Sequence, residues 1–198
     1  MLSFKAFKKS GKKVEAGKNG IVSKEKVVES QELKKQLSAV YEKALSLQLE
    51  GQYKAAIKYY KKILLSELHA SSRLKKLVYS NLSDCYKARN NLQKSIIYCI
   101  EAVSLDRADV VLWDRIAKHA LELKNMPLAR QASESALSVA PTYWPCLDRY
   151  SKILFAISDF TSLSRVLELA FAVNPAYPFG LKILEYLNSP RKADFYLF

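Results

Sequence analysis

Residues 110–143 read VVLWDRIAKHALELKNMPLARQASESALSVAPTY, and the pattern of residue classes in this stretch of 34 residues recurs on both sides of it. Two small residues, Ala117 and Ala136, flank the large apolar Met126. A step of 34 residues in either direction from each of the three reaches a residue of the same class. The matching residues are Ser83 and Ser151 for Ala117, Leu92 and Phe160 for Met126, and Ala102 and Ala170 for Ala136. The order of small, large and small side chains therefore persists over three units.

An earlier unit has the same order, with Ala44, Tyr53 and Ala56 as its small, large and small residues. Ala44 precedes its counterpart Ser83 by 39 residues, so the first two units are separated by a short insertion. The surplus falls around residues 68–76 (LHASSRLKK), a polar stretch suited to a longer loop or to a helix extension.

This period is typical of tetratricopeptide repeats, in which each unit is a helix, a turn and a second helix. A small residue on one helix lets the next helix approach closely, and large residues fill the space beside it. We therefore predict an all-α tetratricopeptide-repeat solenoid of about four repeats, forming one domain over residues 31–188. The predicted repeats span about residues 37–70, 76–109, 110–143 and 144–177, and a terminal helix follows at residues 178–188.

Turn and cap residues support these boundaries. The predicted turns within the repeats are Gly51-Gln52-Tyr53, Asn90-Asn91-Leu92, Asn125-Met126-Pro127 and Ser158-Asp159-Phe160. Asn125 is suited to cap the helix that follows it, and Pro127 falls in a first helical turn, where proline is tolerated. Pro141 and Pro175 are expected to end the second helices of the third and fourth repeats.

The composition agrees with a packed helical domain. The chain has 198 residues, of which 49% are apolar and 26% charged, and it contains only 5 glycines and 6 prolines. We find no apolar run of membrane-spanning length and no apolar segment of a secretory signal at the N-terminus. Cys85, Cys99 and Cys146 are widely spaced and odd in number, which argues against a disulfide framework or a zinc site and favours a reducing compartment.

The N-terminal segment is rich in lysine. Residues 1–35 hold ten lysines and four glutamates within a chain of net charge +13. We expect disorder over residues 1–30, because this composition buries too little apolar surface to offset the entropy of ordering. The paired lysines are Lys8, Lys9, Lys12 and Lys13, which fit either a nuclear-import or polyanion-binding arm or a solubilising tail. Residues 189–198 (SPRKADFYLF) form a tail that ends in apolar and aromatic residues, as expected where a chain is cut from a longer protein.

The chain lacks the residue groups that catalysis requires. Its only histidines, His69 and His119, belong to different repeats, and the chain has no glycine-rich phosphate loop and no metal-binding spacing. The cysteines are best explained as small buried apolar residues. We therefore predict a protein that is not an enzyme and that needs no cofactor, metal or small-molecule substrate.

The first helices of the repeats carry a recurring charge pattern. Asp114-Arg115-Ile116-Ala117-Lys118 matches Asp148-Arg149-Tyr150-Ser151-Lys152 one period later. The candidate groove residues are Asp84, Lys87, Asp114, Arg115, Lys118, Asp148, Arg149 and Lys152. They form either a basic ridge suited to an acidic segment, or solvated helix faces whose charges pair with one another, which we favour.

Two other binding modes are disfavoured. Chaperone-binding repeats grip a C-terminal carboxylate with lysines and asparagines, whereas this chain has Tyr41, Leu45 and Asp84 at those positions. Five aromatic residues have repeat spacing, so we assign them to the core rather than to a base-stacking platform. They are Trp113, Tyr143, Trp144, Phe155 and Phe160.

Two stretches go beyond a general repeat pattern. Residues 111–130 (VLWDRIAKHALELKNMPLAR) and 140–160 (APTYWPCLDRYSKILFAISDF) resemble the N-terminal repeats of the calcineurin-binding protein cabin family. The resemblance is most specific at Leu112-Trp113, Met126-Pro127-Leu128-Ala129-Arg130 and Trp144-Pro145-Cys146-Leu147-Asp148, and it extends over about residues 39–187. It does not include the lysine-rich segment.

The resemblance implies a nuclear scaffold of the HIRA histone-chaperone complex, which acts in replication-independent nucleosome assembly. Its partners would be other subunits of that complex, and calcineurin binding is not implied, because the family places it far C-terminal of these repeats. The alternative is a free-standing adaptor that binds acidic peptides or nucleic acid through the basic groove and arm. Salt separates the two, because binding to nucleic acid weakens steeply as salt rises.

Overall fold

The computed structural model describes residues 18–66 and 70–188, with side chains from residue 31 onward. Every regular element in these ranges is an α-helix, which confirms the predicted fold class. The helices are α1 (Lys18–Leu49), α2 (Tyr53–Leu65), α3 (Ser72–Ala88), α4 (Leu92–Leu105), α5 (Val110–Glu122), α6 (Met126–Val139), α7 (Trp144–Ala156), α8 (Phe160–Val173) and α9 (Pro178–Asn188). No helix among the described residues has both the length and the apolar character needed to cross a membrane.

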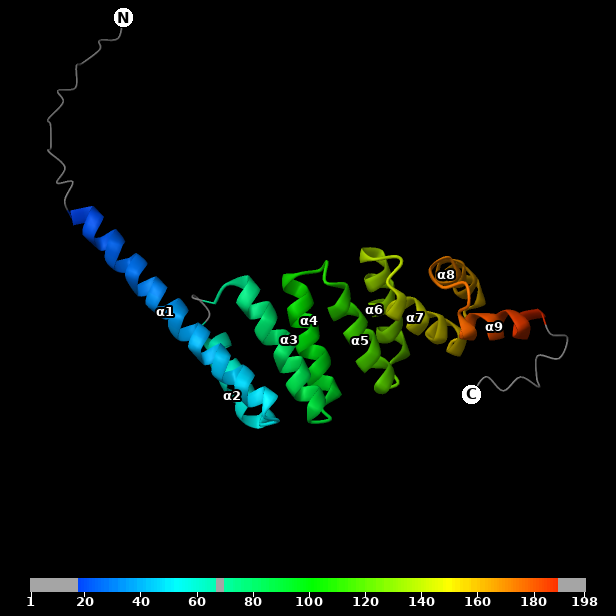
Figure 1. Cartoon of the computed structure of the whole chain (residues 1–198), viewed down its shortest axis with the longest axis horizontal. Coiled ribbons are helices and arrows are strands. Elements are labelled where there is room, and N and C mark those ends of the chain that lie inside the picture. The colour runs from blue at the N-terminus through cyan, green and yellow to red at the C-terminus, as the bar shows by residue number, and fades with distance from the viewer. Residues whose placement is uncertain (1–17, 67–69, 189–198) are drawn as a thin grey trace, which may run out of the picture.

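The helices pair as the period predicts. Each packs chiefly against its neighbours in the sequence, so that α1 with α2, α3 with α4, α5 with α6 and α7 with α8 form four repeats. Figure 1 shows these pairs side by side along the long axis of the molecule, with α9 at the end of the stack. We call α1, α3, α5, α7 and α9 the A helices, and α2, α4, α6 and α8 the B helices.

The four turns within the repeats share one backbone geometry. In each of the four turns, the second residue after the A helix adopts a positive φ, at Gly51 (75°), Asn90 (56°), Lys124 (57°) and Ser158 (59°). The next residue donates its backbone N–H to the carbonyl five positions earlier, as in Asn125 to Ala120 at 2.9 Å. This bond is the signature of a Schellman motif, which satisfies a carbonyl at the end of the helix.

Side-chain caps begin most of the helices. The capping oxygens belong to Ser71, Asn91, Asp109, Asn125 and Asp159. Each accepts a hydrogen bond from a backbone N–H in the first turn, which would otherwise have no partner. The predicted cap at Asn125 is thus confirmed, and Pro127 lies in the first turn of α6. Ser71 starts α3 at Ser72, so the insertion is both a longer connection and a helix extension.

The small positions lie where the helices approach most closely. The side chains of the two small sets have no exposed surface, and they are Ser83, Ala117, Ser151, Ala102, Ala136 and Ala170. One apolar cluster runs from α4 to α9 and a second from α1 to α4, and Tyr79 packs against both. Trp113, Trp144 and Phe155 pack against the first cluster, as the core assignment predicts. The assignment is wrong for Phe160, which is 38% exposed at the start of α8, and Tyr143 is only half-buried.

The N-terminal region differs from the prediction. Helix α1 begins at Lys18, so residues 18–30 are helical where we expected disorder. The composition of this segment disfavours order when the segment stands alone, whereas a helix that is already nucleated in a packed region gains one hydrogen bond per added residue. The lysines Lys8, Lys9, Lys12 and Lys13 lie outside the described residues, as does the tail at residues 189–198.

Candidate protein-interaction site

The A helices are joined by a ladder of polar contacts. In the second, third and fourth repeats, a residue near the middle of the A helix donates a hydrogen bond to the preceding A helix. The donor and acceptor pairs are Asn81 Nδ2 to Tyr41 Oη (3.0 Å), Arg115 Nη1 to Ser80 Oγ (3.1 Å) and Arg149 Nε to Asp114 Oδ1 (3.0 Å). The three donors, and the three acceptors, occupy equivalent positions of successive repeats, so the ladder follows from the period itself.

The strongest link of the ladder joins Asp114 of α5 to Arg149 of α7. The guanidinium makes two hydrogen bonds to the carboxylate, at 3.0 and 3.2 Å. The side chains are only 14% and 21% exposed, and a bidentate pair of this kind fixes orientation as well as distance. One repeat earlier, Arg115 pairs with Asp84 at 2.8 Å. Burial raises the pKa of Asp84, and the Arg115 charge opposes that rise.

The other candidate groove residues are also mostly paired. Lys87 contacts Glu122 at 2.6 Å, and Lys152 contacts Asp148 at 2.9 Å. Asp148 also accepts a hydrogen bond from the Tyr177 hydroxyl at 2.9 Å. The structure therefore brings seven of the eight candidate groove residues into ion pairs. The eighth, Lys118, is exposed and forms no ion pair with any of the described residues. Little of the expected basic ridge carries uncompensated charge.

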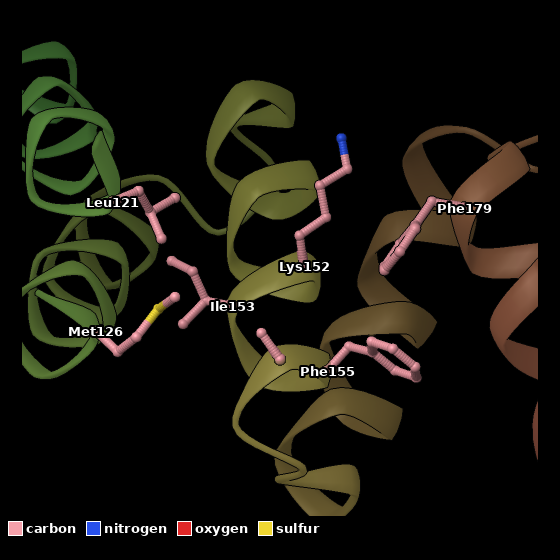
Figure 2. Close-up of a pocket in the computed structure, with 7 residues that line it drawn as sticks. Leu121, Met126, Lys152, Ile153, Phe155 and Phe179 are labelled. Carbon is pink, nitrogen blue, oxygen red and sulfur yellow. The ribbon is translucent and has the colours of Figure 1, made fainter. Parts of the chain in front are cut away.

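An apolar pocket lies beside this ladder, between the last two repeats and α9. It has a volume of about 480 Å³ and is lined by Leu121, Met126, Lys152, Ile153, Phe155, Ala156 and Phe179. In Figure 2, Leu121 and Met126 point toward Ile153, while Lys152 extends away from the apolar floor. The pocket is within the size range of sites that hold a small molecule or an inserted side chain.

The walls of the pocket are rigidly held. The rings of Phe155 and Phe179 meet edge to face, with their centroids 6.0 Å apart. The Lys152 ammonium lies 5.8 Å from the centroid of the Phe179 ring, a distance at which a cation is attracted to an aromatic face. The Lys152 ammonium therefore lies at the rim of an apolar pocket. This arrangement could accommodate a partner's apolar side chain in the pocket and a neighbouring carboxylate beside Lys152.

Sequence reasoning missed this pocket. The repeat pattern predicts packing roles for Met126 and Phe155. Phe155 does pack against the core cluster, whereas Met126 is half-buried, and both line the pocket. The remaining wall is Phe179, in the first turn of α9. The available signal was the run of apolar residues in the predicted helix at residues 178–188.

The buried polar groups do not form a catalytic site. His119 is 2% exposed, and its Nδ1 lies 3.0 Å from Ser95 Oγ, inside the second and third repeats. Burial, assisted by the charge of Lys87, lowers the pKa of His119 to about 4. Burial raises the pKa of Cys85 to about 11 and that of Cys146 to about 12, so both thiols stay protonated at neutral pH.

The part of the chain that the structure describes contains no group of three metal-ligating side chains. His69 lies outside that part. Stacked helical repeats of this kind present extended surfaces to which other proteins bind.

Comparison with known proteins places the chain more closely. Residues 34–191 match the family model described as the CABIN1 N-terminal domain. Calcineurin-binding protein 1 of Arabidopsis thaliana is 24% identical over 117 residues, which are 59% of this chain but 6% of that protein. The chain therefore corresponds to a small part of this curated relative.

Solved structures with similar folds are tetratricopeptide-repeat proteins. One from Parabacteroides merdae is 17% identical, with a TM-score of 0.68 over 77% of this chain and 60% of the other. The first repeat domain of Spaghetti (RPAP3), bound to the HSP90 peptide SRMEEVD, is 19% identical, with a TM-score of 0.53 over 63% of this chain and 95% of the other. At these identities the likeness shows the shared fold.

Proposed function

The chain belongs to the CABIN1 N-terminal domain family, and from that premise we propose that it is the repeat module of a HIRA-type histone-chaperone scaffold. In this role it acts in the nucleus, in replication-independent nucleosome assembly, and it binds protein subunits of the complex. The family membership and the repeat fold support a protein-interaction scaffold directly. The proposal adds the complex, the compartment and the binding surface.

The main support for the proposed binding surface is the apolar pocket with Lys152 at its rim. Repeat solenoids offer a surface that spans several A helices, and partners lie along it. The pocket supplies an apolar anchor site, which is the part of an interface that contributes most to affinity. The flanking ladder of ion pairs holds α3, α5 and α7 in register, so that the surface is formed before a partner arrives.

The chemistry of the rim indicates the kind of segment that binds. Lys152 is 52% exposed although it pairs with Asp148, so its ammonium remains accessible to a second carboxylate. An apolar or aromatic side chain in the pocket, followed by an acidic residue, satisfies both features. A structural neighbour of this fold, the Spaghetti repeat domain, binds an acidic peptide that contains methionine and valine, SRMEEVD.

A substitution that fills the pocket tests the proposal. Ala156 is the exposed last residue of α7 and lines the pocket, so Ala156→Trp blocks it without removing a core contact. The matched control is Ala88→Trp, at the exposed last residue of α3, which occupies the same position two repeats earlier. Tagged wild type and both variants are used in pull-downs from nuclear extract at moderate and high salt, with mass spectrometry.

We expect the wild type and Ala88→Trp to recover HIRA-complex subunits at both salt concentrations. Ala156→Trp should reduce that recovery at least about tenfold, as expected for the loss of an interface anchor. Equal recovery by the two variants would exclude the pocket as the docking site. If other proteins are recovered in place of HIRA-complex subunits, and Ala156→Trp reduces their recovery, the proposed complex is excluded but the pocket remains the docking site.

A second candidate is a free-standing adaptor whose groove binds acidic peptides. It is favoured by the exposure of Lys118 and Lys152 on the same face of successive A helices. In the same pull-down, an adaptor of this kind would recover acidic proteins that are lost as salt rises, because exposed charge pairs are screened. The arm at Lys8–Lys13, which would extend this mode to nucleic acid, lies outside the described residues.

A further inference from the structure

The net positive charge of the chain arises entirely from its N-terminal half. Residues 1–94 contain 21 lysines and arginines against 8 aspartates and glutamates, which accounts for the whole net charge of +13. Residues 95–198 contain 11 basic and 11 acidic residues. Residues 31–66 and 70–94, whose side chains the structure describes, hold 13 lysines and arginines against 4 aspartates and glutamates. Since the repeats are stacked in chain order, this surplus lies at the end of the solenoid that contains the first repeat, α3 and the start of α4.

Helix α2 concentrates this charge on one side. Its 13 residues include four lysines and no acidic residue. The buried side of the helix consists of Ala56, Ile57, Tyr60 and Ile63. The exposed side carries Lys54, Lys58, Lys61 and Lys62, which follow the helical repeat and which we call the α2 lysine face.

The α2 lysine face has no acidic partner among the described residues. This distinguishes it from the basic residues of α3, where Lys76 pairs with Asp106 and Asp109, and Lys87 with Glu122. Lys61 lies over a tyrosine instead, with its ammonium 6.0 Å from the centroid of the Tyr86 ring. Hydrogen bonding to Tyr86 raises the pKa of Lys61, so it stays charged at neutral pH.

Aromatic rings hold the neighbouring cations in place. Tyr86 stacks on Tyr98 with the two planes 11° apart and the centroids separated by 5.3 Å. Lys94 at the start of α4 lies 5.5 Å from the same Tyr86 ring. This stack therefore positions cations from two B helices, α2 and α4, and extends the basic surface beyond α2.

One more ring lies on the surface itself. Tyr59 is 37% exposed, and it lines an open hollow of about 330 Å³ together with Lys58 and Lys62. Ammonium groups on either side of an accessible aromatic ring are the pattern with which proteins hold phosphates while a base or sugar rests on the ring. An acidic peptide would use the lysines but has no need of the ring.

We propose that the α2 lysine face, with Tyr59, binds the phosphate backbone of a nucleic acid without reading its sequence. Lysine ammonium groups contact phosphates as point charges, and sequence readout would require side chains that reach base edges. Helix α2 is about 20 Å long, a length along which duplex DNA carries about a dozen phosphates. This surface lies at the other end of the stack from the α7–α9 pocket, so it is independent of the proposed protein-binding function.

The test measures binding of the full chain to nucleic acid by fluorescence anisotropy. The probes are a labelled DNA duplex and a labelled single strand, each of about 20 nucleotides in length, at about 50 and about 200 mM salt. The variant Lys54→Gln/Lys58→Gln/Lys61→Gln/Lys62→Gln removes the charges of the α2 lysine face. The control removes four exposed charges from the balanced half, and comprises Arg107→Gln, Lys124→Gln, Arg165→Gln and Lys182→Gln.

We expect the wild type to lose affinity by about 100-fold or more between the two salt concentrations, as for a protein that neutralises at least four phosphates. The α2 variant should bind at least about tenfold more weakly at low salt, with a salt slope shallower by about 3 to 4. The control variant should stay within about twofold of the wild type. Because all three proteins keep the lysine-rich N-terminal segment, the comparison isolates the α2 lysine face.

Several results would overturn the proposal. Equal weakening by the α2 variant and the control would show that net charge alone drives binding. An α2 variant that binds like the wild type would assign binding to another segment. Tighter binding to polyglutamate or to anionic phospholipid vesicles, used as competitors, would assign the surface to an acidic protein or a membrane.

A second variant guards against a folding defect. Lys54→Gln/Lys58→Gln/Lys62→Gln keeps the contact between Lys61 and Tyr86, and its melting temperature should equal that of the wild type. It should reproduce most of the affinity loss. Tyr59→Ala should weaken binding to the single strand more than binding to the duplex, because only unpaired bases can stack on the ring.

Discussion

At the scale of single residues, the fold depends on positions where no larger side chain fits. Ala136 of α6 has no exposed surface, and its equivalents in the flanking repeats are the fully buried alanines Ala102 and Ala170. A small side chain here is a condition for the close approach of two helices, because protein interiors are packed to crystal-like density. The same position therefore reports whether the repeat register is correct.

Ala136→Trp should destabilise the protein by about 1–3 kcal/mol or more, because overpacking a tight helix contact displaces its neighbours. The exposed Ser138, on the same helix, provides the matched control, and Ser138→Trp should change the free energy of unfolding by less than about 0.5 kcal/mol. Thermal melting measures both. An unchanged melting temperature for Ala136→Trp would show that the register is wrong.

His119 links the stability of the domain to pH. Its pKa is lowered to about 4 by burial, whereas an unfolded histidine titrates near 6.5. The unfolded state therefore binds a proton between these values while the folded state does not, so stability falls as pH drops from about 6.5 to 4. The loss attributable to this residue is about 3 kcal/mol at the lower limit.

The measurement is the free energy of unfolding against pH, for the wild type and for His119→Gln. The glutamine retains a hydrogen-bonding group near Ser95 Oγ but does not titrate. Above pH 7 the difference between the two proteins should be constant, and below it the wild type should lose stability faster. Parallel curves down to pH 4 would contradict a neutral buried imidazole.

At the scale of elements, the attachment of α9 depends on one glycine. A Cβ at Gly180 would lie 2.8 Å from Phe171 Cζ and 2.8 Å from Tyr177 Cδ1, so no side chain fits between α8 and α9. This close approach also places Phe179, in the first turn of α9, at the wall of the pocket. The packing of the last helix and the binding surface are therefore coupled.

Gly180→Ala should lower the free energy of unfolding by about 1–3 kcal/mol, since α9 must shift to make room. It should also weaken partner recovery, because Phe179 moves with the helix. Leu181→Ala is the control, since Leu181 is 50% exposed and its truncation leaves the contact with α8 unchanged. If Gly180→Ala retains both stability and binding, α9 has no part in the site.

At the scale of the whole molecule, the two ends of the stack have different chemistry. The first repeat carries a surplus of lysines on α2, while the last repeats and α9 have balanced charge and an apolar pocket. Between them, the ladder from Asn81 through Arg115 to Arg149 ties successive A helices together. In a solenoid each repeat contacts only its neighbours, so such links determine how rigidly the ends are related. The architecture thus allows one chain to hold two partners at a defined separation.

The helical repeat and the turns within it can be read from the sequence alone, although the starts of α1 and α3 cannot. Small and large residues at a fixed step, caps such as Asn125 and stops such as Pro141 act within a few residues of their own position, so each can be read locally. The charge pattern Asp-Arg-x-x-Lys, by contrast, was ambiguous between a basic ridge and paired faces. Arg115 and Arg149 each pair with an aspartate on the preceding A helix, more than thirty residues earlier in the chain.

Which charged side chains lack a partner depends on how the helices pack in three dimensions. The rotation of one repeat against the next brings Arg149 onto Asp114 and leaves the lysines of α2 without acidic partners among the described residues. It also opens the pocket between α7 and α9, since Phe155 and Phe179 meet there from different elements. Periodicity specifies which residues face a neighbouring helix, whereas pairing and hollows depend on the distance and angle between helices, which side-chain packing sets.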